Sequence, residues 1–187
     1  MVLMESKVFS TTQKIIIVII SAAVFTLPFF FKGASLEAVI DGVFLAVLGL
    51  QAAIDALTMK IYRGLNLLLL VAAVLSALVT SSLHLPERLI GAAIVSLPML
   101  ALSVMIGAFG MGDVKLCAVI GFFLGWQKML VAFFFAVIVA GITAAIARLL
   151  RKDGERMPFV PYLAFGTAAA YAVGGYLIEA YTVLLFG

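Results

Sequence analysis

The sequence predicts an all-α polytopic membrane protein with about seven apolar helices. Of the 187 residues, 66% are hydrophobic and 11% are charged, and the mean hydropathy is +1.30. Soluble domains carry about 25% charged residues, so this composition excludes an ordinary soluble protein. No polar stretch is long enough to form a second folded unit, and residues 1–187 are therefore expected to form a single membrane domain. The single cysteine, Cys117, excludes an internal disulfide and a cysteine-based zinc site.

Seven apolar segments follow one another, separated by short polar stretches. They cover residues 15–31, 39–58, 65–83, 89–109, 114–126, 129–150 and 159–186. Six of them are long enough to cross about 30 Å of hydrocarbon at about 1.5 Å per helical residue. The fifth segment is roughly 20 Å long as a helix and falls short. We expect this short helix to start inside the membrane, with the backbone before it facing protein or a water-filled cavity.

The first apolar segment, 15–31, resembles the apolar part of a signal peptide, because Lys7 and Lys14 precede it. It is longer than most such regions, and it ends in Phe29-Phe30-Phe31 without an A-x-A-like cleavage site. We therefore predict a first membrane span that is retained.

The distribution of basic residues predicts the orientation in the membrane. One set of segment ends carries Lys7, Lys14, Lys60, Arg63, Lys115, Arg148, Arg151, Lys152 and Arg156, and the alternate set carries Lys32, Arg88 and Lys128. The richer set is expected on the cytoplasmic side, which puts the N-terminus in the cytoplasm and the C-terminus outside. The basic pI of about 9.1 is then a topology signal, and we expect no nucleic-acid partner.

A polar motif, Gly110-Met111-Gly112-Asp113, opens the short fifth segment. An ionisable side chain at membrane depth is costly and by default suggests a functional site. Glycines beside it permit a close approach of a substrate backbone, which larger side chains would block.

A second carboxylate, Asp55, lies about one turn inside the inner end of the second segment, at a depth similar to that of Asp113. By contrast, Glu37, Asp41 and Glu87 are expected at or near the outer ends of spans. Two neighbouring carboxylates can share one proton, so that the ionised partner activates water and the protonated one donates to a carbonyl oxygen. The pair Asp55–Asp113 therefore predicts an aspartic peptidase.

Three other interpretations of the two aspartates remain. Each could have a structural role, either by capping a helix or by forming an ion pair with a nearby lysine, Asp113 with Lys115 and Asp55 with Lys60. The pair could also be a relay in a small transporter or proton-conducting protein. The chain could also be a membrane assembly factor without catalysis. Zinc and Ser–His peptidase chemistry are not expected, since the only histidine, His84, falls in an outer loop.

Several stretches resemble the type IV prepilin peptidase family. They are Asp55, Gly110-Met111-Gly112-Asp113-Val114-Lys115-Leu116, Gly121-Phe122-Phe123-Leu124-Gly125-Trp126 and the run from Met157 to Gly166. The likeness covers residues 37–186 and is strongest over 110–126. It implies an intramembrane aspartic endopeptidase that cuts leader peptides from prepilin-like or pseudopilin precursors at the cytoplasmic face of the plasma (inner) membrane.

The resemblance further implies catalytic roles for Asp55 and Asp113 and substrate contacts for Gly110, Gly112 and Lys115. Neither a metal nor a cofactor is implied, and the partners are the precursor and the lipid bilayer.

Three departures from the family are evident. Ile61-Tyr62-Arg63 stands where members usually have Ile-Pro-Asn. The cysteine-containing cytoplasmic insertion is missing, so methyltransferase activity is not expected. The segment 15–31 is extra relative to the smallest members.

Overall fold

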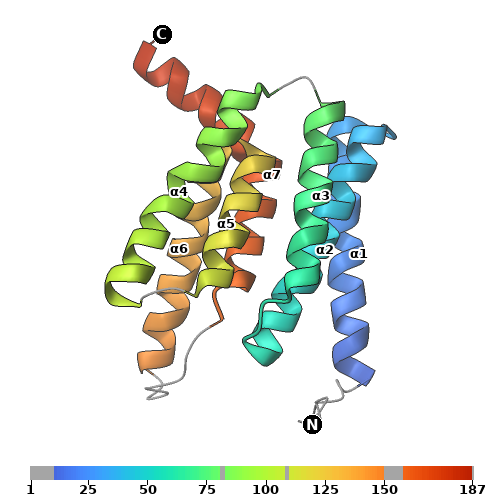
Figure 1. Cartoon of the computed structure of the whole chain (residues 1–187). Coiled ribbons are helices and arrows are strands. Elements are labelled where there is room, and N and C mark those ends of the chain that lie inside the picture. Colours follow the sequence, from blue (N-terminus) through green and yellow to red (C-terminus); the bar gives the residue numbers. More distant parts are fainter. Residues whose placement is uncertain (1–10, 81–82, 108–109, 150–157, 187) are drawn as a thin grey trace.

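The computed structural model describes residues 11–80, 83–107, 110–149 and 158–186. Within these residues the chain forms seven α-helices and no strand, which confirms the predicted all-α fold. The helices are α1 (Thr11–Lys32), α2 (Leu36–Thr58), α3 (Arg63–Val79), α4 (Leu85–Ile106), α5 (Met111–Leu124), α6 (Trp126–Leu149) and α7 (Val160–Phe186). They run alternately up and down (Figure 1), so the ends of α2, α4 and α6 lie together at one end of the bundle, the lower end in that view.

Four of these helices contain stretches long and apolar enough to cross a membrane: Leu36–Thr58, Leu85–Ile106, Trp126–Ile146 and Val160–Leu184. The protein is therefore a multi-pass membrane protein. Two further apolar helical stretches are Ser21–Lys32, within the 22-residue α1, and Arg63–Val79. Of these two helices, only α3 is shorter than its predicted segment, 65–83. For α3 the reason is local, because the helix ends where Thr80 takes an extended conformation with φ −91° and ψ 119°. Its 17 residues reach the lower limit for a transmembrane helix.

The short helix α5 has 14 residues, as its apolar segment predicts. Gly110 forms its N-cap, with an extended backbone at φ −72° and ψ 144°. In Figure 1 the lower ends of α1 and α6 reach further down than the start of α5. The polar motif at its start is thus set back from the lower end of the bundle.

Small residues allow α5 to pack against α4 at backbone distance. A Cβ added at Gly121 would collide with the carbonyl group of Gly91, and one added at Gly91 would collide with the backbone of Gly121 and Gly125. Gly91 and Gly121 therefore let α4 and α5 pack closely. Aromatic rings join α5 to two other helices, since Phe123 stacks on Phe44 of α2 at 3.9 Å between ring centroids and on Tyr171 of α7 at 6.2 Å.

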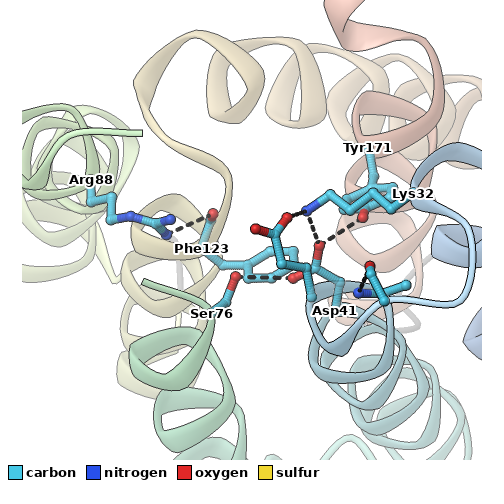
Figure 2. A network of polar contacts seen from close by, with 9 residues as sticks. Lys32, Asp41, Ser76, Arg88, Phe123 and Tyr171 are labelled. Atoms are coloured by element: carbon cyan, nitrogen blue, oxygen red, sulfur yellow. Dashed lines mark hydrogen bonds and ion pairs between the residues drawn. The ribbon is translucent and has the colours of Figure 1, made fainter. Parts of the chain in front are cut away.

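The upper end of the bundle contains a buried polar network centred on Asp41 (Figure 2). Asp41 Oδ2 accepts hydrogen bonds of 2.7 Å from Lys32 Nζ and 2.7 Å from the Tyr171 hydroxyl. Its Oδ1 accepts one of 2.9 Å from Ser76 Oγ. Only 2% of Asp41 is exposed. The sequence alone placed this residue near the outer end of a span without distinguishing it from the other acids there, and the structure places it in the core.

Candidate active site

Asp55 lies in the last turn of α2, where the helix terminates. The N–H of Met59 donates to the Asp55 carbonyl at 2.7 Å, and Met59 itself has the left-handed φ of 52° that ends the helix. The Asp55 side chain is 5% exposed. Its Oδ2 accepts a hydrogen bond of 3.1 Å from the backbone N–H of Val160, the first residue of α7. Asp55 therefore faces the N-terminus of another helix, whose dipole favours a carboxylate.

Asp113 occupies the first turn of α5, three residues after the N-cap. Its carboxylate accepts a hydrogen bond from the backbone N–H of Gly110. This is the side-chain-to-N-cap contact of a capping box, and it holds the carboxylate against the start of its own helix. A Cβ at Gly110 would lie 3.1 Å from Asp113 Oδ2, so the glycine leaves room for the carboxylate.

The carboxylates of Asp55 and Asp113 interact electrostatically across the lower end of the bundle. Neither takes part in the lysine ion pairs that the sequence left open. Lys60 and Lys115 are exposed, and the ion pairs among the described residues join Lys32 to Glu37 and to Asp41. The structure thus places the two predicted aspartates within electrostatic reach of each other, and the side chains of Lys60 and Lys115 are exposed.

Gly112 makes a contact that the sequence did not reveal. A Cβ at this position would lie 3.0 Å from Cδ1 and 3.1 Å from Cβ of Ile61. Ile61 belongs to the connection that follows α2, so the backbone of the motif packs directly against the chain just beyond Asp55. Next to it, Tyr62 has φ −83°, close to the range that proline prefers.

Two residues near the aspartates escaped the sequence analysis. Val160 is one, because its contact with Asp55 joins positions 105 residues apart. Gln51 is the other: it is fully buried one turn before Asp55 on α2, and neither atom of its amide has a hydrogen-bond partner in the described part of the chain. The sequence does contain a signal for Gln51, because a glutamine is unusual within an apolar segment.

The other candidate groups lie away from this pair or pack within the core. Cys117 is buried, and its Sγ lies 3.3 Å from Met99 Sδ, as expected for a packing residue. His84 is exposed at the start of α4. Across the residues that the structure describes, no three His, Cys, Asp or Glu side chains gather as a possible metal site. The predicted metal-free chemistry stays a prediction.

A comparison with protein families matches residues 42–145 to the type IV leader peptidase family. This range is more than half of the chain. The chain belongs to the type IV leader peptidase family. Both Asp55 and Asp113 lie in the matched range, whereas α1 and α7 lie outside it.

A curated relative gives the same result over a shorter stretch. The chain is 40% identical over 83 residues to the prepilin leader peptidase/N-methyltransferase of Bacillus subtilis (strain 168), and the match covers 43% of this chain and 34% of the relative. This chain thus spans about a third of the length of that leader peptidase. No solved structure matches. The prediction that 37–186 form the peptidase core of this family member, with 15–31 as an addition, remains a prediction.

Proposed function

We propose that this protein is an intramembrane aspartic endopeptidase that removes the leader peptide from prepilin-like precursors, with Asp55 and Asp113 as the catalytic pair. The observation that supports the proposal is the electrostatic interaction of these two carboxylates at one end of the bundle, where each accepts a hydrogen bond from a backbone N–H. Family membership supports the peptidase reaction. The excess of basic residues supports a cytoplasmic position for this end and an orientation in the plasma membrane with the C-terminus outside.

The proposed reaction uses the pair as acid and base. The ionised carboxylate takes a proton from water while the water oxygen attacks the carbon of the scissile carbonyl. The protonated carboxylate gives its proton to the carbonyl oxygen, which produces a neutral tetrahedral intermediate. The carbon–nitrogen bond then breaks as the leaving nitrogen takes up a proton from the pair. At the same time one hydroxyl of the intermediate returns its proton to the pair as the carbonyl forms again. Two protons thus enter the pair and two leave it over the whole reaction, so the pair returns to its starting state.

An apolar cavity beside Asp55 suggests where the substrate helix is received. The cavity has a volume of about 370 Å³ and lies between α1, α2 and α7. Small side chains line the cavity from two helices. They include Ala52 and Ala56 of α2 and Pro161 and Ala164 of α7. Ala52 and Ala56 flank Asp55 in sequence, and Pro161 follows its hydrogen-bond donor Val160. Small residues let helix backbones approach closely in membranes, so we propose that the apolar helix of the precursor packs here.

The leader itself is proposed to meet the site from the cytoplasmic side. Lys115 is exposed one turn along α5 from Gly112 and is placed to contact the polypeptide there. The acids of the 152–156 loop, Asp153 and Glu155, remain candidates for holding a basic leader, although this loop lies outside the described residues.

The test is cleavage in a co-expression experiment. The full chain is produced together with a pilin-like precursor, and a leader-sized shift in mobility is expected only when the chain is present. A second precursor carries the same leader fused to a soluble domain in place of the apolar helix, and this fusion is expected to remain uncut. Equal cutting of the two fusions would exclude recognition of the apolar helix. Ion flux without cleavage would instead support the transporter interpretation.

A further inference from the structure

A cavity of about 560 Å³ opens at the upper end of the bundle, opposite to the two aspartates. All seven helices or their caps contribute to its wall. Its polar lining residues are Lys32, Asp41, Ser76, Thr80, Arg88, Lys128, Tyr171, Tyr176 and Glu179. Its volume lies in the range of small-molecule sites.

Both carboxylate oxygens of Asp41, a buried residue of this wall, already accept hydrogen bonds. Asp41 accepts three hydrogen bonds, from Lys32, Tyr171 and Ser76, and Lys32 also pairs with Glu37 at 3.3 Å (Figure 2). The other lining acid, Glu179, is exposed on the rim. The buried wall therefore offers no carboxylate that is still free to bind a cationic ligand.

The donors on the same wall are only partly used. Arg88 is 1% exposed, and its Nη1 donates to the carbonyl oxygen of Phe122 at 3.3 Å. It also donates to the carbonyl oxygen of Phe123 at 3.4 Å (Figure 2). Its Nε has no hydrogen-bond partner among the described residues, and the same holds for the buried hydroxyl of Thr80. Lys128 is partly buried and forms no hydrogen bond or ion pair with any described residue. It lies within the electrostatic reach of both Lys32 and Asp41. The carboxylate of Asp41 is already hydrogen-bonded to Lys32, Tyr171 and Ser76.

The unpaired polar atoms of Arg88 and Thr80 and the ammonium group of Lys128 would be stabilised by the same kind of ligand. A buried donor without an acceptor costs free energy, and two neighbouring ammonium groups repel each other. A ligand that supplies several acceptor oxygens and negative charge would remove both costs. Arginine is especially suited to phosphate, whose oxygens match its planar set of donors.

We infer that the upper cavity binds a phosphate group, with Arg88, Lys128 and Thr80 as its ligands. The phosphate can come from a phospholipid headgroup or from solution. The position suits a headgroup, because α6 begins beside the cavity at Trp126, and tryptophan is enriched at the depth of the lipid headgroups. Basic pockets between membrane helices also bind lipid headgroups. This inference does not depend on the peptidase reaction.

The experiment measures binding to the purified, delipidated full chain in detergent. Three probes are compared: dihexanoyl phosphatidylglycerol, dihexanoyl glycerol with the same acyl chains but no phosphate, and inorganic phosphate. We expect the unfolding temperature to rise with the phospholipid and to stay constant with the glycerol lipid. An equal rise with inorganic phosphate would assign the site to a free anion. A rise with neither phosphate-bearing probe would overturn the inference.

Variants separate this site from general charge effects. Arg88 also holds the carbonyl end of α5, so the test uses Lys128→Gln and Thr80→Val instead. Each should weaken binding of the phosphate-bearing probe roughly tenfold, as expected for loss of one hydrogen bond to a charged group. Arg148→Gln removes one positive charge from the exposed lower end of α6 and should bind like the wild type. Unchanged binding by Lys128→Gln, measured by native mass spectrometry, would refute the site.

Discussion

The backbone N–H of Val160 donates a 3.1 Å hydrogen bond to Oδ2 of Asp55. The contact places the start of α7 against the last turn of α2. The donor is a backbone group that every residue except proline supplies. The family match ends at residue 145, so this support for Asp55 comes from a part of the chain beyond the matched region.

Removing the N–H of Val160 should therefore impair the site without unfolding the protein. Val160→Pro deletes this donor at the first position of a helix, where proline is well tolerated. We expect cleavage of a co-expressed precursor to fall by about tenfold or more, the usual effect of losing a hydrogen bond to a charged group. Val160→Ala keeps the N–H and serves as the control for packing. If both variants lose the same activity, packing and not the hydrogen bond is responsible.

Asp55→Asn and Asp113→Asn should each abolish cleavage. The amide keeps the size of the side chain and can still accept the backbone hydrogen bond, but it cannot act as acid or base. We expect a loss of at least about a hundredfold, with normal insertion and an unchanged unfolding temperature. Substantial activity in either variant would remove that residue from the catalytic pair. Glu179→Gln, on the exposed rim of the upper cavity, is the control and should cleave normally.

Gly112→Val should reduce cleavage through a collision with Ile61. The added side chain would enter the space that Ile61 occupies and would displace the connection after Asp55. The double variant Gly112→Val with Ile61→Ala restores that space, so it should recover part of the cleavage rate. If the second substitution recovers nothing, the valine blocks the substrate directly, as the sequence alone predicts.

Asp41→Asn should destabilise the protein by about 3 kcal/mol, because it removes the charge from a buried carboxylate that binds Lys32, Tyr171 and Ser76. From sequence alone this substitution is expected to be nearly silent for cleavage, and the burial of Asp41 adds the expectation of a loss of stability. Thermal unfolding followed by the fluorescence of the single tryptophan, Trp126, measures the effect. An unfolding temperature equal to that of the wild type would show that the network contributes little stability.

Gly121→Ala should destabilise the bundle by about 1–3 kcal/mol, since its Cβ would collide with the backbone of Gly91 on α4. Gly141→Ala is the matched control inside a helix, because nothing lies within 4 Å of its added Cβ. This control should be neutral or stabilising by up to about 1 kcal/mol, through the better helix propensity of alanine. Equal unfolding temperatures for the two variants would contradict the close contact of α4 and α5.

The sequence predicts the helices well, because polar residues bound each apolar run, and the length of the run predicts the length of the helix. The short α5 is predicted for this reason, and so is the position of Asp55 and Asp113 at the same end of the bundle. The burial of Asp41 is not predictable in this way. Its distance from the start of α2 gives its depth, but only packing against α3 and α7 determines that its side chain points into the core.

The support of Asp55 by Val160 and the contact of Gly112 with Ile61 also lie beyond the sequence. Both depend on how separate helices are placed in space, and hydrophobic periodicity describes each helix by itself. The partnerless amide of Gln51 is a similar case, since a buried polar side chain is recognised only when its surroundings are known.

The stacked rings of Phe44 and Phe123 join α2 to α5. They touch at 3.9 Å near the upper end of α2 and α5. Asp55 lies eleven residues further along α2, about 16 Å away, and Asp113 lies ten residues back along α5, about 15 Å away. A tilt of about 10° between the two helices at the rings would move one carboxylate relative to the other by roughly 3 Å. A tilt at this contact would therefore change the separation of the two acids, and Phe123 also forms part of the wall of the upper cavity.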